Sequence, residues 1–201
     1  MAQVIALGAE AQISKDSYLD KETVVKNRLK KNYRNNILDS TIIKSRTKQE
    51  ALLLHHAKLA GVNTPIVYKT NRKGTIVMEH INGKLLRENL GKENYKGICR
   101  EIGSGIAKIH GAGIVHGDLT TSNLIMRGKE LFFIDFGLGF FSKKQEDFAV
   151  DLLNFKKTYS ATHFNLLEGW EIITNAYTKE FLQGKEVVAK IEEIEKRARY
   201  L

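Results

Sequence analysis

The chain has 201 residues, of which 42% are hydrophobic and 27% are charged, and its formal net charge is +9. This balance suits one globular domain with one or two lobes, and it excludes a disordered chain, a collagen-like chain and a coiled-coil rod. The single cysteine, Cys99, excludes an internal disulfide framework and a zinc site made of several cysteines. The first residues lack the pattern of a signal peptide, and no run of 18 apolar residues occurs. We therefore expect a cytoplasmic protein without a membrane segment, and the charge favours an anionic partner.

The first part of the chain is predicted to be rich in strands. Its expected elements are short strands within residues 1–38, including Val4–Leu7 and Thr23–Lys26, one long helix, and a hairpin of residues 66–70 and 75–80. The helix is expected to begin at an N-cap formed by Asp39-Ser40 and to end at Gly61.

The pattern becomes mostly helical after Gly83. The apolar spacing predicts helices around residues 98–109, 148–159, 166–177 and 187–198, with short strands at 124–126 and 131–134. A boundary between a strand-rich part and a helical part is therefore expected near residues 81–84.

One carboxylate lies on the apolar face of the long helix. Ile43, Thr47, Glu50, Leu54 and Ala57 form a single stripe at helical spacing. A buried carboxylate is unfavourable unless it is paired, so Glu50 is either a tolerated edge position or the partner of a buried cation. Lys26, which ends an apolar strand in the same half, is the candidate cation.

A second group of polar residues surrounds the two short strands after residue 123. Asn123 precedes the first strand and Asp135 follows the second, so their oxygens are expected to face one opening. Two such oxygen ligands suit magnesium, with phosphate oxygens and water completing its coordination. Asp118 lies beside them, placed to orient or deprotonate an attacking hydroxyl group or water.

Each of these motifs is weak alone, but their order is specific. A strand Lys, a helix Glu, His-x-Asp-x-x-x-x-Asn at 116–123 and Asp-Phe-Gly at 135–137 together resemble the protein kinases. The resemblance implies a two-lobed α+β fold that binds ATP and magnesium between its lobes. It also makes Val77–Ile81 similar to a kinase hinge, in which the Glu79 carbonyl and the Ile81 N–H would contact adenine.

The resemblance assigns a role to each candidate residue. Catalysis is expected from Asp118, Lys26 and Glu50, magnesium binding from Asn123 and Asp135, and support of the catalytic loop from His116 and Asp151. ATP binding is expected from Leu7, Gly8, Ala9, Glu10, Ala11, Lys26, Glu79 and Ile81.

The chain also departs from the usual kinase pattern. The loop at residues 8–11 has one glycine, and Gly117 replaces the arginine that usually precedes the catalytic aspartate. About nine residues separate Gly137 from the next predicted helix near Asp147, too few for an activation segment with its Ala-Pro-Glu motif. We therefore expect a minimal kinase without the usual surface for docking peptides.

With these departures, the sequence closely resembles one group of kinases. It is the small atypical kinase of the KEOPS complex, or PRPK family, in its archaeal form. The shared motifs are Gly-Ala-Glu-Ala at 8–11, the pattern Val-x-Lys-x-Arg-x-x-Lys-x-Tyr-Arg at 24–34, Arg46-x-x-x-Glu50-Ala51, and residues 116–123. The resemblance implies one kinase domain, 1–201, with small lobe 1–80, hinge 79–83 and large lobe 84–201. It implies an ATPase or Ser/Thr kinase subunit that acts with a sugar-kinase-like subunit in threonylcarbamoyl adenosine modification of tRNA. One departure is the tail Lys196–Leu201, which lacks the family's glycine.

Other interpretations stay open at this point. A small-molecule phosphotransferase of the aminoglycoside type shares residues like those at 116–123, and a Rio-type kinase also lacks an activation segment. A pseudokinase scaffold is disfavoured because Lys26, Glu50, Asp118, Asn123 and Asp135 are all present. The basic residues of 28–34 and 196–199 are either solvated charges or contacts, the first to nucleotide and the second to tRNA or a neighbouring subunit.

Overall fold

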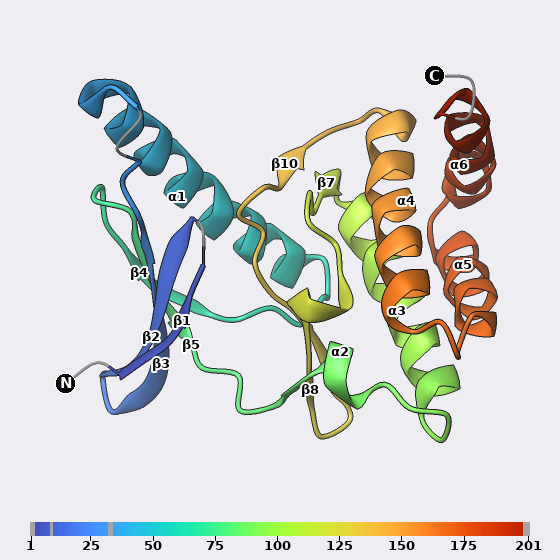
Figure 1. Cartoon of the computed structure of the whole chain (residues 1–201), viewed down its shortest axis with the longest axis horizontal. Helices are drawn as coiled ribbons and strands as arrows, with labels where there is room; N and C mark the ends of the chain where they lie inside the picture. The colour runs from blue at the N-terminus through green and yellow to red at the C-terminus, as the bar shows by residue number, and fades with distance from the viewer. Residues whose placement is uncertain (1–2, 9, 32–33, 199–201) are drawn as a thin grey trace.

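The structure is a computed structural model that describes residues 3–8, 10–31 and 34–198. A five-stranded sheet and one long helix form one lobe, and a group of helices forms the other (Figure 1). Within the described residues, no helix combines the length and the apolar character needed to cross a membrane.

The sheet of the first lobe is antiparallel, in the order β1-β2-β3-β5-β4. Its strands are β1 (Gln3–Leu7), β2 (Ala11–Tyr18), β3 (Lys21–Arg28), β4 (Val67–Thr70) and β5 (Thr75–Glu79). The expected hairpin of the last two strands is present. Strand β2 has no specific signal in the sequence, because only Ala11 and Ser14 of that strand are buried and most of its other residues are polar. Its place comes from pairing with β3 along the full length, closed by a turn at Leu19 and Asp20 with φ of 50° and 58°.

Helix α1 (Asn36–Leu59) covers this sheet, and its start differs from the prediction. Asn35 is the N-cap, with its side chain accepting the N–H of Ile37 at 2.9 Å. Asp39 lies inside the first turn instead, where its buried carboxylate accepts the N–H of Lys31 and pairs with Arg34. Both residue types are good caps, and here Asp39 is occupied by the preceding loop. The end of the helix is as predicted, with Gly61 in a left-handed conformation.

The second lobe contains the helices expected from the apolar spacing. They are α3 (Tyr95–Gly111), α4 (Gln145–Thr162), α5 (Glu168–Glu180) and α6 (Gly184–Ala198), with a short α2 (Leu86–Asn89) before them. Leu166, predicted as part of the third helix, lies before α5, where its carbonyl accepts the hydroxyl of Tyr159.

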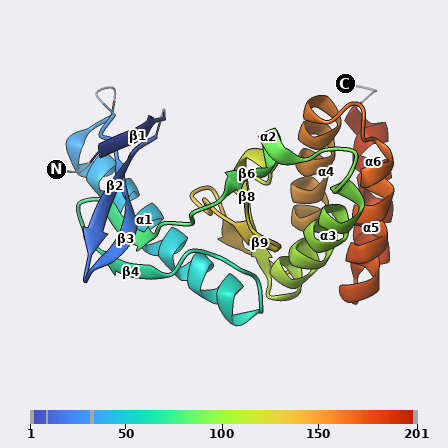
Figure 2. The same ribbon diagram turned by 90° about the horizontal axis from the view of Figure 1, so that it is seen from below.

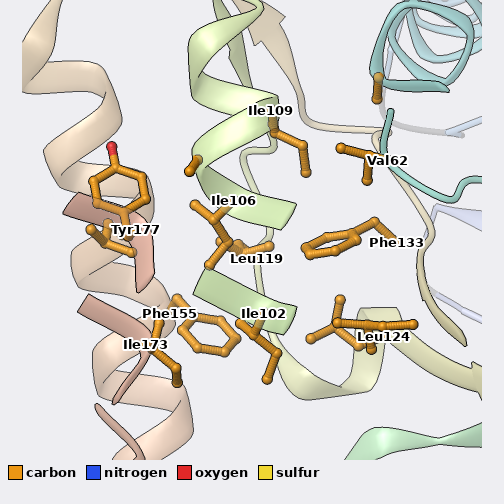
Figure 3. Packing of buried hydrophobic residues seen from close by; sticks show 14 of the residues in the cluster. Val62, Ile102, Ile106, Ile109, Leu119, Leu124, Phe133, Phe155, Ile173 and Tyr177 are labelled. Atoms are coloured by element: carbon orange, nitrogen blue, oxygen red, sulfur yellow. The ribbon is translucent and has the colours of Figure 1, made fainter. Parts of the chain in front are cut away.

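One hydrophobic core runs through both lobes. Ile102, Ile106 and Ile109 of α3 face Phe133 and Leu124 on one side and Tyr177 on the other (Figure 3). The same cluster includes Leu53, Leu54 and Ala57 of α1 and Ile76 and Met78 of β5. Each large apolar side chain that is fully buried stabilises the fold by about 1.5–3 kcal/mol. The relative position of the lobes is therefore set partly by a shared core.

Short strands flank the motif residues where the lobes meet (Figure 2). They are β6 (Lys84–Leu85), β7 (Ile114–Val115), β8 (Leu124–Arg127), β9 (Glu130–Phe133) and β10 (Phe140–Phe141), with the 3-10 turn η1 (Thr121–Asn123). β8 pairs with β6 and β9, and β10 pairs with β7. These pairings bring residues 116–123 and 135–137 to one end of the same ribbon.

Candidate active site

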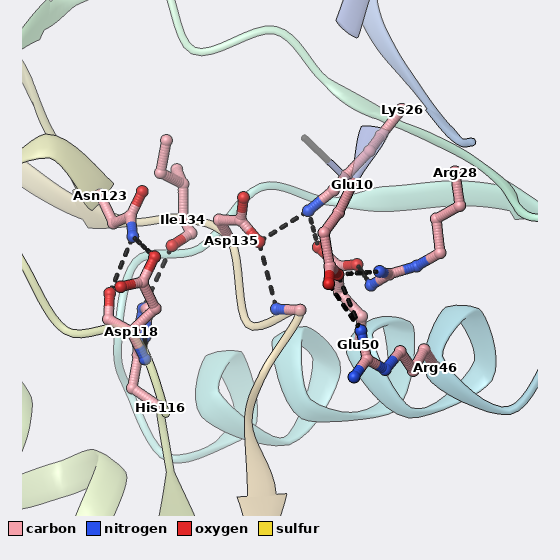
Figure 4. Close-up of polar contacts among 11 residues, drawn as sticks. Glu10, Lys26, Arg28, Arg46, Glu50, His116, Asp118, Asn123, Ile134 and Asp135 are labelled. Carbon is pink, nitrogen blue, oxygen red and sulfur yellow. Dashed lines mark hydrogen bonds and ion pairs between the residues drawn. The ribbon is translucent and has the colours of Figure 1, made fainter. Parts of the chain in front are cut away.

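The ion pair expected between the first lobe's strand and helix is present. Lys26 Nζ of β3 lies 2.7 Å from Glu50 Oε1 of α1 (Figure 4). Glu50 is only 1% exposed. The carboxylate in the apolar stripe therefore has the buried cation that its position demanded.

Glu50 has a second cation, whose position was predicted wrongly from the sequence. Arg28 was expected in a basic loop, but it is the last residue of β3, and its Nη2 lies 2.5 Å from Glu50 Oε2. Alternate residues of a strand face the same side, so Arg28 follows Lys26 toward α1. The pairing of Arg28 with Ala11 of β2 keeps the strand extended to this point.

Asp135 lies next to Lys26. Its Oδ1 is 2.6 Å from Lys26 Nζ and accepts the N–H of Gly137 at 3.1 Å. Burial acts to raise the pKa of Asp135, but the Lys26 ammonium and these hydrogen bonds outweigh it and hold the pKa below its ordinary value. Asp135 is therefore ionised at neutral pH, and its φ of 61° turns the carboxylate toward the sheet lobe.

Two polar residues of the loop at 116–123, Asp118 and Asn123, contact each other. Asn123 Nδ2 donates to the Asp118 carbonyl at 2.8 Å and to Asp118 Oδ2 at 3.0 Å. This uses the amide nitrogen, and Figure 4 shows Oδ1 of Asn123 pointing away from Asp118. An amide oxygen and the ionised carboxylate of Asp135 are ligand types that magnesium accepts. Among the described residues, no three His, Cys, Asp or Glu side chains form a metal cluster of their own.

The loop around His116 is held from behind by α4. Asp151 accepts the N–H groups of His116 and Gly117 at 2.8 and 2.9 Å, and contacts with His110 and His116 keep its pKa low despite burial. Burial lowers the pKa of His116, whose Nε2 hydrogen-bonds to the Ile134 carbonyl at 3.1 Å. The neutral imidazole thus links the strand before Asp135 to the strand before Asp118.

Gly117 explains one departure from the kinase pattern. Its φ is 81°, and a Cβ atom at this position would collide with the carbonyl group of Leu138. The segment after Asp-Phe-Gly therefore packs directly on the backbone where other kinases carry an arginine side chain.

That segment is also fixed to helix α1. Gln49 Nε2 donates to the Gly139 carbonyl at 2.6 Å, and the ring of Phe141 packs edge-on against His56. Residues 138–144 connect Gly137 to α4, so the connection is as short as the sequence predicts. The helix that carries Glu50 and the segment that follows Asp135 are thus joined at two places.

Buried residues of the second lobe extend this support, and they were not predicted from the sequence. His110 of α3 contacts Asp151 Oδ2 at 3.3 Å and the hydroxyl of Tyr177 at 2.8 Å. His163, after α4, contacts Thr121 Oγ1 of the loop at 116–123 at 3.1 Å. Neither histidine is near its partner in the sequence, and only the fold brings them together.

A cavity of about 300 Å³ joins these residues to the loop between β1 and β2. It is lined by Ala6, Gly8, Glu10, Ala11, Ile13, Lys26, Arg28, Asp118, Asp135, Gly137 and Leu138. Of the predicted ATP-binding loop, Gly8, Glu10 and Ala11 line the cavity, Leu7 is exposed outside its lining, and Ala9 lies outside the described residues. Glu10 is bound by Arg46 of α1 at 2.8 and 3.0 Å.

The predicted hinge lies at the end of β5, away from the lining of that cavity. The carboxylate of Glu79 accepts from Arg127 of β8 at 3.0 Å and from the N–H of Ile66 at 3.2 Å. Ile81 is buried. Glu79 thereby ties the sheet lobe to the ribbon, while the contact of both residues with adenine stays a prediction. A larger cavity of about 710 Å³, between α3, α5 and the β8–β9 turn, contains none of the predicted site residues.

Comparison with known proteins identifies relatives of the whole chain. Residues 11–153 match the RIO domain family. The chain is 43% identical over 211 residues to the KEOPS complex subunit Bud32 of Pyrococcus abyssi, covering 98% of this chain and 96% of that protein. It is 40% identical to a probable bifunctional tRNA threonylcarbamoyladenosine biosynthesis protein of Methanothermobacter thermautotrophicus, over 98% of this chain but 36% of that relative. The chain therefore spans about a third of the length of such bifunctional relatives.

The fold is shared with a solved kinase structure. The Rio2 kinase from Chaetomium thermophilum, in a complex with ADP, Mg²⁺ and phosphoaspartate, superimposes with a TM-score of 0.71 at 14% identity. The match covers 99% of this chain and 72% of that one. At this identity the likeness concerns the fold alone, and it confirms the predicted two-lobed, kinase-like α+β architecture.

Proposed function

We propose an ATP-dependent function for this chain, which belongs to the RIO domain family and, within it, to the Bud32 family. The function is that of an atypical Ser/Thr kinase and ATPase that serves as a KEOPS subunit in threonylcarbamoyl adenosine modification of tRNA. The RIO match, residues 11–153, lies within the longer match to Bud32, which covers 98% of this chain, so the Rio-type interpretation and the KEOPS interpretation are compatible.

The observation that carries the proposal is the grouping around Lys26. Its ammonium contacts Glu50 and Asp135, and it lies beside a cavity that Asp118 also lines. In this proposal Lys26 binds the α- and β-phosphates of ATP, and Glu50 fixes the lysine. Gly8, Ala9, Glu10 and Ala11 cover the nucleotide, with Leu7 at the start of the loop, and the Glu79 carbonyl and Ile81 N–H bind adenine.

Asn123 Oδ1 and Asp135 are the residues that would hold magnesium. Bound there, the ion would neutralise charge on the phosphate oxygens. Asp118 orients the attacking hydroxyl group or water and accepts its proton while the bond between the γ-phosphorus and the ADP oxygen breaks. His116 and Asp151 keep the loop of Asp118 in place through the N–H and carbonyl contacts described above.

The relatives' names support membership of the KEOPS complex, while the sugar-kinase-like subunit and the cytoplasm rest on the family resemblance. Bud32 of Pyrococcus abyssi is a KEOPS subunit, and the bifunctional relatives join a similar chain to a longer second part. We therefore propose that this chain works beside a sugar-kinase-like subunit, meets tRNA through the complex, and acts in the cytoplasm. We also propose the division into small lobe 1–80, hinge 79–83 and large lobe 84–201.

The test compares ATP hydrolysis by the chain alone, with the sugar-kinase-like subunit, and with that subunit plus tRNA. The expected result is hydrolysis that requires magnesium and rises when partner and tRNA are added. Asp118→Ala serves as the inactive control. A wild-type chain that neither binds nor hydrolyses ATP in any of these mixtures would refute the proposal.

A further inference from the structure

The carboxylate of Glu50 is held by two different cations. Oε1 receives Lys26 Nζ at 2.7 Å, and Oε2 receives Arg28 Nη2 at 2.5 Å. The Arg28 side chain is 4% exposed, and its Nε is buried without a hydrogen-bond partner among the described residues. Burying a guanidinium group costs desolvation free energy unless an opposite charge pairs with it. Glu50 is the buried carboxylate that pairs with Arg28.

Lys26 also contacts a residue that Arg28 does not. Its Nζ lies 2.6 Å from Asp135 Oδ1, and the two residues hold each other in this structure. If Asp135 turns to a metal ion and Lys26 to phosphate, that contact weakens, because each group then shares its charge with the ligand. Glu50 then needs a second cation that stays in place. With Lys26 as its only partner, and Lys26 also contacting phosphate, the buried Glu50 carboxylate would be much less stabilised than with two cations.

We propose that Arg28 is a positioning residue that permanently neutralises Glu50, so that Lys26 is free to exchange the Asp135 carboxylate for a nucleotide phosphate. This inference rests on the nucleotide-binding function proposed above and adds the residue on which that exchange depends. Without Arg28, Lys26 would be the only cation paired with Glu50. The Lys26 ammonium would then attract the nucleotide phosphates less strongly.

Substituting Arg28 could also change ADP binding through its contact with Glu10. Arg46, which binds the same carboxylate, provides a control for this effect. Arg28 Nη1 lies 3.6 Å from Glu10 Oε2, and Arg46 binds the same carboxylate at 2.8 Å while Glu50 is held by Lys26 and Arg28. Arg46→Met therefore disturbs Glu10 alone, whereas Arg28→Met disturbs both carboxylates.

The test is calorimetric binding of ADP and of adenosine to the full chain, without magnesium so that metal binding plays no part. We expect Arg28→Met to weaken ADP binding about tenfold, the effect of removing one hydrogen bond to a charged group, and to leave adenosine binding unchanged. Arg28→Gln, which keeps a donor for Glu50, is expected to recover part of the affinity. It also serves if Arg28→Met fails to fold. Arg46→Met is expected to change ADP binding much less.

The dependence on Glu50 separates this role from a direct phosphate contact. In a Glu50→Gln background, Arg28→Met is expected to change ADP affinity less than about twofold, since contacting residues give non-additive effects. The inference is overturned if Arg28→Met and Arg28→Gln bind ADP like the wild type, if Arg46→Met is equally weakened, or if the full decrease persists with Glu50→Gln. A wild-type chain that binds no ADP would instead refute the proposed function.

Discussion

Lys26 Nζ lies 2.6 Å from Asp135 Oδ1, so the proposed phosphate-binding lysine and the proposed metal-binding aspartate are paired with each other in this structure. Each of the two groups would have a different partner once nucleotide and metal bind. Binding of both ligands would therefore divide the charge that Lys26 and Asp135 now give to each other and to Glu50.

Asp135→Ala should remove most of the magnesium dependence of ATP binding. The substitution deletes a carboxylate that would contact the ion, so affinity measured with magnesium should fall about tenfold or more toward the value in EDTA. Titration calorimetry with and without magnesium measures both values. An alanine variant that keeps the full gain in affinity on adding magnesium would contradict the role given to Asp135.

Asp118→Ala should abolish turnover while nucleotide still binds. A residue that orients and deprotonates the attacking group contributes about 10²–10⁴-fold to the rate. The variant should therefore have a kcat at least about 100-fold lower, with its affinity for ADP unchanged. Wild-type turnover by Asp118→Ala would show that another group activates the nucleophile.

Stability should fall as the pH drops below about 6.5. Burial lowers the pKa values of His116 and His163 from the ordinary 6.5, so in that range the unfolded chain takes up protons that the folded chain does not. The stabilisation is complete above pH 6.5 and decreases as the pH falls toward the folded-state pKa values. Each histidine contributes a slope of up to about 1.4 kcal/mol per pH unit.

His163→Gln should flatten this dependence, because glutamine can bind Thr121 without titrating. Urea unfolding from pH 5 to 8 measures the slope, with the exposed His55→Gln as control. A slope that is the same in His163→Gln and the wild type would mean that His163 keeps an ordinary pKa in the folded chain.

The isolated chain should phosphorylate arbitrary peptides poorly and need no loop phosphorylation. Residues 138–144 are held against α1 and Gly117, which leaves no separate shelf for a peptide in this part of the described chain. Assays with generic Ser/Thr peptides before and after phosphatase treatment check this. Efficient peptide phosphorylation, or a drop in ATPase activity after phosphatase, would count against it.

Removing residues 196–201 should weaken tRNA binding by the reconstituted complex. Lys196 and Arg197 lie in the last turn of α6, where Arg197 also pairs with Glu146 at 3.4 Å, and residues 199–201 lie outside the described residues. If these cations neutralise phosphates, the plot of log K against log salt should become less steep by about 1 for each phosphate that is no longer neutralised. The control, Lys143→Gln with Lys144→Gln, removes two positive charges elsewhere, against three in the truncation. An unchanged slope in the truncated chain would make the tail a packing element.

The sequence was most informative about the site where a charged residue occurs in an apolar pattern. Glu50 on an apolar stripe required a cation, and Lys26 is there. Arg28 was misplaced because its burial depends on the length of β2, a polar strand that is defined only by pairing with its neighbour. The start of α1 was wrong because Asn35 and Asp39 are both suitable caps, and the choice depends on the loop before them. The contacts of His110 and His163 join residues far apart in sequence and had no local signal.

The hydrogen bond from Gln49 to Gly139 has a consequence for control of the protein. Many kinases are switched by rearranging an activation loop while other elements shift with it. Here Gln49, next to Glu50, is hydrogen-bonded to Gly139 in the short segment after Asp-Phe-Gly. An outward movement of α1 would break this hydrogen bond and also separate Phe141 from His56. An inactive conformation reached by that route would be unfavourable for the chain by itself. A partner or ligand that moved α1 in that way would have to compensate for the loss of both contacts.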